Sequence, residues 1–177
     1  MLITNDKKIL LHVCCAPCAT ACVERLLTDD RDVSLYFSNS NINSEAEFEK
    51  RLSYVEKIAG IFDVNLEIDP YCHDGWLTHV RGLEKEAEKG LRCVKCFDWG
   101  LGRTAAKASE LGIAVFATSL TVSPHKNSAV IFEAGNQYSG FEPLDFKKRD
   151  GFKRSRELSE KFGLYRQSYC ACEFSLN

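Results

Sequence analysis

The cysteine-rich segment at residues 8–22, reading KILLHVCCAPCATAC, constrains the fold more than any other part of the chain. Residues 9–13 form a short apolar run that fits a buried strand, and Pro17 favours the start of a helix directly after it. Cys14 and Cys15 therefore fall at the carboxyl end of a strand. In open α/β sheets this edge is where ligands bind, so we expect the chemistry of the protein there.

The remaining sequence alternates between strand and helix patterns. Strands are predicted at 33–37, 64–68 and 115–118, with an extended segment at 144–146, and helices at 19–27, 44–60, 76–88, 97–111, 128–137 and 155–162. Ser44 and Glu47 form a capping-box pattern, and Gly112 is a predicted helix C-cap. The alternation predicts an α/β fold, with a mostly parallel sheet flanked by helices, in a single domain over residues 1–177.

Composition and charge exclude some classes of protein. The chain is 45% hydrophobic and 27% charged, with a net charge of −2, which is ordinary for a soluble globular protein and argues against bulk attraction to nucleic acid. No apolar run approaches the roughly 20 residues of a membrane helix. The N-terminal segment lacks the pattern of a signal peptide, so we expect a cytoplasmic protein with no membrane partner.

Nine cysteines in 177 residues are too many for ordinary core use. In the cytosol such clusters are more often metal ligands or catalytic thiols than disulfides. Cys93 and Cys96 have a metal-ligating spacing, and together with Cys14 and Cys15 they supply the four thiolates of a [4Fe–4S] cluster or a zinc site. Adjacent cysteines chelate a single zinc ion awkwardly, which favours the iron–sulfur cluster. Three unrelated sets of buried thiols are the alternative.

The other cysteines have weaker patterns. Cys170 and Cys172 could ligate metal or form a small, strained, redox-active disulfide. Cys18 lies in the first turn of a predicted helix, where the helix dipole lowers a thiol pKa, so it is a candidate for a catalytic or metal-binding role. Cys22, one helical turn later, fits core packing. Cys72 follows a strand, and a buried structural thiol is the favoured interpretation.

Several segments, in order along the chain, together resemble the QueH-type epoxyqueuosine reductases. They are HVCCAPC at 12–18, a looser match at 39–51, RCVKC at 92–96, TSLTVSPHK at 118–126 and YRQSYCAC at 165–172. The chain departs from the family pattern at Ala171, where glycine is expected, and at Ser40 and Asn43, where prolines are expected.

The resemblance implies a Rossmann-like fold related to nucleotide α-hydrolases, and an enzyme that reduces the epoxide of epoxyqueuosine in tRNA to queuosine, the last step of queuosine biosynthesis. It places the [4Fe–4S] ligands on Cys14, Cys15, Cys93 and Cys96. The redox-active pair falls on Cys170 and Cys172, in a C-terminal tail that returns to the active site. The family also implies a second mononuclear metal, iron or zinc, for which Cys18 and Asp69 are the candidate ligands. The electron donor and the oligomeric state are open.

A tRNA substrate requires phosphate contacts. Residues 147–166 hold eight basic and three acidic residues, a local charge of +5 in an otherwise acidic chain. We therefore expect tRNA contacts from Lys126 and from the basic segment, at Lys147, Lys148, Arg149, Lys153 and Arg154. A solvated charged helix is the alternative.

Two other functions compete with the reductase. A zinc-stabilised RNA-binding module would use the same four thiolates without catalysis. A thiol–disulfide oxidoreductase acting on proteins would use Cys170 and Cys172, but it explains neither the other thiols nor the basic segment.

Overall fold

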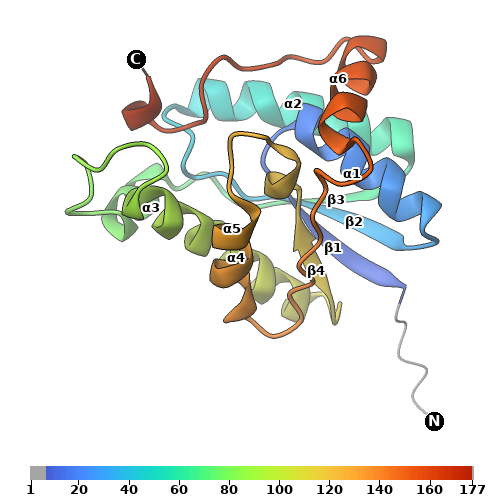
Figure 1. The fold of residues 1–177 in the computed structure, drawn as a ribbon, viewed down its shortest axis with the longest axis horizontal. Helices are drawn as coiled ribbons and strands as arrows, with labels where there is room; N and C mark the ends of the chain where they lie inside the picture. The colour runs from blue at the N-terminus through green and yellow to red at the C-terminus, as the bar shows by residue number, and fades with distance from the viewer. Residues whose placement is uncertain (1–6, 177) are drawn as a thin grey trace.

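A computed structural model describes residues 7–176 and contains one four-stranded sheet. Its strands are β1 (Lys8–Val13), β2 (Asp32–Phe37), β3 (Asn65–Ile68) and β4 (Phe116–Thr118). All pairings are parallel, in the order β3-β2-β1-β4 (Figure 1). The predicted α/β class with a parallel sheet is confirmed, and the strand order matches one half of a Rossmann fold.

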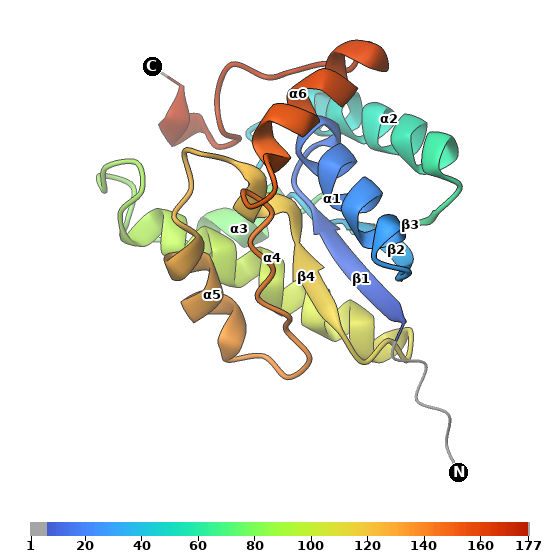
Figure 2. The ribbon, with the colours of Figure 1, turned by 45° about the vertical axis from the view of Figure 1, so that its right-hand side comes forward.

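Helices cover both faces of this sheet, as Figures 1 and 2 show. The helices α1 (Ala16–Thr28), α2 (Glu45–Phe62) and α6 (Gly151–Lys161) lie on one face. The other face carries α3 (His73–His79), α4 (Leu91–Glu110) and α5 (Ser128–Asn136). Two short 3-10 helices, η1 (Ser119–Val122) and η2 (Glu173–Ser175), complete the fold. Residues 9–13 of β1 are all buried because alternate side chains enter the cores on the two faces.

The α2 helix begins as its sequence predicts. The hydroxyl of Ser44 accepts a hydrogen bond from the amide of Glu47 at 3.3 Å, which satisfies one of the free N–H groups of the first turn. The helix was predicted to end near Gly60; it continues two residues further, to Phe62, and stops where Asp63 adopts a left-handed conformation at φ +52°. Glu47 and the next turn of α2 face the C-terminal tail.

The predicted helix over 76–88 was also wrong. The helix α3 ends at His79, and turns follow as far as Gly90. The buried guanidinium of Arg92 donates to the carbonyl oxygens of Leu83, Glu84 and Glu86, and so holds this loop in a non-helical path. Helix α4 then starts at Leu91, six residues before its predicted start. Cys93 and Cys96 therefore lie on its first two turns.

Smaller differences concern the last third of the chain. The segment 144–146 forms no strand, because a turn begins at Phe146, and α6 begins at Gly151, four residues before its predicted start. A side chain at Gly151 would place its Cβ 1.7 Å from the carbonyl oxygen of Phe146, so glycine permits this close approach. Gly112 ends α4 with φ +66°, as predicted. Within residues 7–176, no helix is long and apolar enough to cross a membrane.

Candidate active site

At the carboxyl edge of the sheet, the turns that follow β1 and β4 lie next to each other. Cys14 follows β1, and its neighbour Ser119 follows β4. The backbone N–H of Cys14 donates to the hydroxyl of Ser119 at 3.2 Å, and this hydroxyl lies 3.5 Å from the Cys14 sulfur. In a sheet of this order, β1 and β4 flank the point where the chain reverses direction and where a ligand crevice forms. Cys14 is thus placed at the crevice by the strand itself.

Three thiols meet at this point. The sulfur atoms of Cys14, Cys15 and Cys18 all lie within 4.8 Å of one another, and those of Cys14 and Cys15 are 4.0 Å apart. Hydrogen bonds from Cys14 and Cys18 hold the pKa of the Cys15 thiol well below its usual value. In the other direction, the contact with Cys15 raises the pKa of the Cys14 thiol, and the contacts with Cys14 and Cys15 raise the pKa of the Cys18 thiol. This electronic arrangement suits a thiolate nucleophile or a metal ligand.

The donor set fits a metal centre. Thiolates around one tetrahedral zinc ion lie about 3.8 Å apart, given a Zn–S bond of about 2.3 Å. The 4.0 Å spacing between Cys14 and Cys15 is close to that value, and a cubane holds its ligand sulfurs farther apart. The triad as it stands is therefore compact enough for one ion, and a cluster bound by Cys14 and Cys15 needs further sulfur donors from elsewhere.

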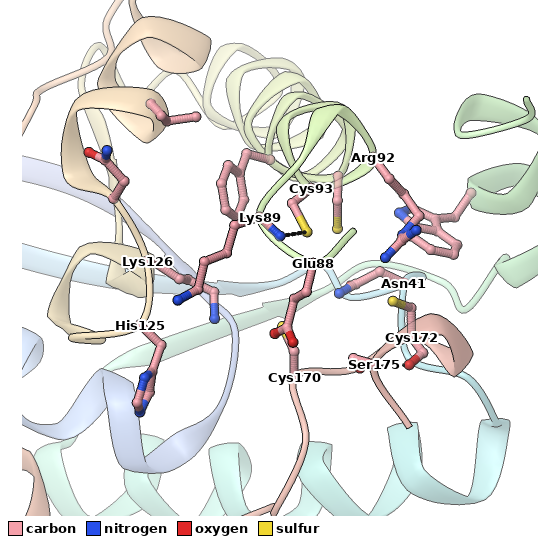
Figure 3. Close-up of a pocket in the computed structure, with 15 residues that line it drawn as sticks. Asn41, Glu88, Lys89, Arg92, Cys93, His125, Lys126, Cys170, Cys172 and Ser175 are labelled. Atoms are coloured by element: carbon pink, nitrogen blue, oxygen red, sulfur yellow. Dashed lines mark hydrogen bonds between the residues drawn. The ribbon is translucent and has the colours of Figure 1, made fainter. Parts of the chain in front are cut away.

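Four more thiols lie across the crevice. Cys93 and Cys96 of α4 line a cavity of about 100 Å³ together with Cys170 and Cys172 of the tail. Figure 3 shows the labelled cysteines around this opening, with Lys89 donating its backbone N–H to the sulfur of Cys93. All four cysteines are free thiols. Burial raises the pKa of Cys96 strongly, and the charge of Cys170 adds to the effect.

A second cavity, of about 400 Å³, joins the two groups of thiols. Its walls include Cys14 and Cys18 as well as Cys96 and Cys170, and the last two line both cavities. Its size is that of a small-ligand pocket. Lys126 also lines both cavities: burial would lower its pKa, but the surrounding thiols, Cys170 foremost, raise it overall. The ammonium group is thus held charged among the sulfurs.

The predicted ligands of one cluster fall into two groups. Cys14 and Cys15 lie with Cys18, whereas Cys93 lines the smaller cavity with the tail cysteines and Cys96 lines both cavities. The joint assignment of Cys14, Cys15, Cys93 and Cys96 to one cluster stays a prediction.

Asp69, the other candidate ligand for a second metal, is already engaged. Its carboxylate accepts hydrogen bonds from Arg103, and from the hydroxyl of Ser38 at 2.7 Å. Burial opposes ionisation of this carboxyl, but Arg103 and Ser38 outweigh it and hold the pKa below its usual value. Asp69 lines neither cavity. Its role as a metal ligand stays a prediction and requires it to leave these partners.

The basic segment is partly neutralised by α1. Arg154 pairs with Glu24 at 2.8 Å, and Arg149 pairs with Asp29 at 3.3 Å. Lys147 donates to the hydroxyl of Ser128. No ion pair involves Lys148 or Lys153 within the part of the chain that the structure describes. Exposed Arg166 lines the larger cavity, so the cationic groups nearest the thiols are Arg166 and Lys126.

Besides Cys15, which is buried beside Cys14, two cysteines line neither cavity. Cys22 is fully buried in the core, as predicted, and its thiol donates to the carbonyl of Cys18 at 3.2 Å. The prediction of a buried Cys72 was wrong, because Cys72 is exposed at the start of α3. Its strand-end position places it near the edge of the sheet, but the chain turns it outward before α3.

Arg51 and His12 also line the larger cavity, although neither was predicted as a site residue. Arg51 lies on the buried, mostly apolar face of α2. A charged residue at such a position indicates a specific polar partner. His12 is buried beneath Cys14 and lines the larger cavity. Its Nε2 faces the Ser38 carbonyl at 3.2 Å and its Nδ1 the Thr118 hydroxyl at 2.9 Å. Since a carbonyl only accepts, Nε2 carries the proton and the ring is neutral, consistent with burial lowering its pKa.

Comparisons with known proteins identify the family of the chain. The family model described as epoxyqueuosine reductase QueH matches residues 9–177. The QueH epoxyqueuosine reductase of Streptococcus pyogenes serotype M1 is 42% identical, over 94% of this chain and 69% of that protein. Those of Staphylococcus epidermidis and Thermotoga maritima are 37% and 34% identical over 95% of this chain, covering 76% and 90% of their own lengths. The chain therefore belongs to the QueH family of epoxyqueuosine reductases.

Proposed function

We propose that this chain reduces the epoxide of epoxyqueuosine in tRNA to the alkene of queuosine, the last step of queuosine biosynthesis. Membership of the family supports the reaction, and the observation that carries it is the pair of joined cavities lined by thiols from the turn after β1, from α1, from α4 and from the tail. A cavity of about 400 Å³ can admit a modified nucleobase while its epoxide meets the sulfurs. Because tRNA is the substrate, we place the enzyme in the cytoplasm.

The electron balance of this reaction matches a dithiol. Removing the epoxide oxygen as water and leaving an alkene consumes two electrons and two protons. Oxidation of Cys170 and Cys172 to a disulfide releases two electrons and two protons, so one turnover of the pair balances one epoxide. An external donor, whose identity is open, then returns the disulfide to the dithiol. Both residues are free thiols and Cys170 is exposed, which supports this role.

We assign a [4Fe–4S] cluster to Cys14, Cys15, Cys93 and Cys96, and a second mononuclear iron or zinc ion to the vicinity of Cys18, with Asp69 as its weaker candidate ligand. When bound, these groups would supply single-electron transfer and a Lewis acid for the epoxide oxygen. The support is a donor set made of sulfur, within which contacts with Cys14 and Cys18 lower the pKa of Cys15. Gln167, which hydrogen-bonds Cys15 and lowers its pKa, contributes a polar group from the tail.

The remaining polar groups have positional roles. Lys126 keeps a positive charge among the sulfurs, and it can stabilise thiolates or orient an anionic part of the substrate. Arg166 lines the larger cavity at the surface and can meet the tRNA backbone. Lys148 and Lys153 extend this cationic surface, whereas Arg149 and Arg154 are committed to acids of α1.

The direct test is substitution of the tail cysteines. Cys170→Ser and Cys172→Ser should each abolish turnover of epoxyqueuosine-containing tRNA in enzyme purified without oxygen, while visible absorbance and iron content stay at wild-type levels. Cys22→Ala is the matched control, because it removes a thiol from the core rather than from a cavity, and it should retain activity. Full activity in either tail variant would remove the dithiol from the reaction.

Metal analysis of the same preparation separates the reductase from a structural zinc module. Iron with a matching paramagnetic signal after reduction supports the cluster assignment. A colourless protein containing zinc alone would contradict it. Loss of the same cluster signal in both Cys14→Ser and Cys93→Ser would support one cluster held by both groups of thiols.

A further inference from the structure

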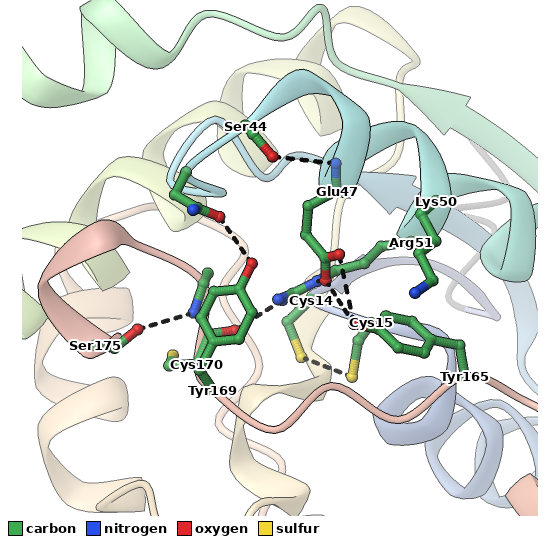
Figure 4. Close-up of polar contacts among 12 residues, drawn as sticks. Cys14, Cys15, Ser44, Glu47, Lys50, Arg51, Tyr165, Tyr169, Cys170 and Ser175 are labelled. Carbon is green, nitrogen blue, oxygen red and sulfur yellow. Dashed lines mark hydrogen bonds and ion pairs between the residues drawn. The ribbon is translucent and has the colours of Figure 1, made fainter. Parts of the chain in front are cut away.

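The C-terminal tail reaches the thiol crevice by crossing the first turns of α2. Figure 4 shows this crossing, with Arg51 between the helix and the tail. The Arg51 side chain is only 2% exposed. Its Nη1 donates to the backbone carbonyl of Cys170 at 2.7 Å, and its guanidinium carbon lies 5.1 Å from the centre of the Tyr169 ring. One buried cation thus contacts both the cysteine and the residue before it.

A carboxylate holds this cation in place. Glu47, one turn earlier on α2, accepts from Nε of Arg51 at 2.7 Å. The same carboxylate accepts from the hydroxyl of Tyr165 at 3.1 Å, and Lys50 lies 3.6 Å from the centre of the Tyr165 ring. The tail is therefore anchored to α2 five residues before Cys170 as well as at Cys170 itself.

The loop before α2 provides the third anchor. The hydroxyl of Tyr169 donates to the side-chain oxygen of Asn43 at 2.7 Å, and the backbone N–H of Asn43 donates to the carbonyl of Ala171 at 3.1 Å. These bonds hold the residues on both sides of Cys170. The backbone carbonyls of Cys170 and Ala171 are thus both bound, and Tyr169 is held through its side chain, although Cys170 itself remains exposed.

Packing alone does not account for Arg51. A buried ion pair contributes little net stability compared with apolar side chains of similar volume. Nη2 of Arg51 is also buried without a hydrogen-bond partner, which adds a desolvation cost. A leucine or methionine would pack this helix against the loop more cheaply. What an apolar side chain cannot do is bind the carbonyl of Cys170 in a fixed direction.

We propose that Arg51 is a positioning residue, which acts with Glu47 to hold the Cys170–Cys172 segment at the mouth of the cavities. The consequence for catalysis rests on the proposed reductase function, whereas the docking of the tail is independent of that function. Arginine suits this role because its planar fork can serve a carboxylate and a carbonyl together, which a lysine ammonium does less well.

Hydrogen exchange read by mass spectrometry tests the docking in the anaerobically purified enzyme. Arg51→Met should raise exchange in peptides covering 165–175, and at Asn43, by about tenfold or more, since the change removes hydrogen bonds to a charged group. Peptides from β1 and β2 should keep their wild-type rates. Arg51→Lys, which leaves Glu47 with a cation, should give a smaller rise, and it decides the question if Arg51→Met does not fold.

The matched control is Arg31→Gln. Arg31 forms a two-bond pair with Glu142 and lines neither cavity, so its loss should leave tail exchange unchanged. Tail exchange in Arg51→Met and Arg51→Lys no greater than in this control would overturn the proposal.

Steady-state kinetics test the consequence for catalysis. Arg51→Lys should lower kcat while the Kd for tRNA stays within about twofold of wild type, because the tail is misplaced but the cationic surface is intact. A loosened tail with unchanged kcat would overturn the positioning role. If the wild-type chain proved not to reduce epoxyqueuosine, the exchange experiment would still decide whether Arg51 docks the tail.

Discussion

Asp69 pairs with Arg103 and also accepts a hydrogen bond from Ser38, which lines the larger cavity. The loss of stability on removing this pair can be estimated. Asp69 is 4% exposed, whereas the Arg103 side chain is 36% exposed. Removing one partner of a fully buried pair costs about 3–5 kcal/mol because a charge is left uncompensated. Since solvent reaches Arg103 and Ser38 still donates to Asp69, we expect about 2–3 kcal/mol for Arg103→Met. At roughly 2–4 °C per kcal/mol, Tm should fall by about 4–12 °C.

The pH dependence gives this prediction its sign. In the wild type the pKa of Asp69 is below its usual value, so the stability from this group is present at neutral pH and is lost only as pH falls through that low pKa. Without Arg103, burial dominates and raises the pKa of Asp69. The variant then regains stability as the carboxyl takes up a proton. The difference between wild type and variant should narrow from pH 7 to about pH 4.

Urea unfolding at both pH values measures the difference. The double variant Asp69→Leu/Arg103→Met should recover much of the lost stability, because it removes both charges together. A single variant as stable as wild type at pH 7, or a difference that widens on acidification, would refute the assignment of Asp69 as a buried, paired carboxylate.

Other predictions concern the metal site, the loop, α6 and the tRNA surface. Asp69→Asn should leave the metal content of anaerobic enzyme unchanged if Asp69 serves only Arg103, and a loss of one metal ion per chain would instead make it a ligand. Arg92→Met should cost at least about 2 kcal/mol in urea unfolding, because three carbonyls of the 80–90 loop lose a charged donor; an unchanged midpoint would contradict this. Gly151→Ala should lower Tm measurably, since its Cβ would overlap the Phe146 carbonyl, and an unaltered Tm would show that α6 shifts freely. Lys153→Gln should weaken tRNA binding and its salt dependence more than Arg154→Gln, which Glu24 already neutralises; equal effects would argue against that distinction.

Much of the fold followed from local patterns. The apolar run before Cys14 and the capping pattern at Ser44 each specify an element by short-range physics, and both predictions are confirmed. The segment after α3 could not be predicted in this way. The local pattern of this segment predicts a helix. The structure has a loop instead, because the guanidinium of Arg92, on the following helix, donates to backbone carbonyls of the loop.

The site shows the same division between local and long-range information. The position of Cys14 at a strand end made the crevice predictable, and the presence of Cys18 in the first turn of α1 made its contact with Cys14 foreseeable. The pairing of Asp69 with Arg103 was not visible, because Asp69 follows β3 and Arg103 lies on α4. Arg51 was equally hidden, since its function depends on a tail that is 119 residues away from it at Cys170.

The most direct measurement is nucleoside analysis of tRNA carrying epoxyqueuosine after incubation with the anaerobic enzyme and a chemical reductant. We predict that the modified nucleoside loses one oxygen atom and becomes queuosine, and that this conversion is absent with Cys170→Ser. An unchanged nucleoside with iron-loaded wild-type enzyme, or conversion by the serine variant at the wild-type rate, would contradict the account.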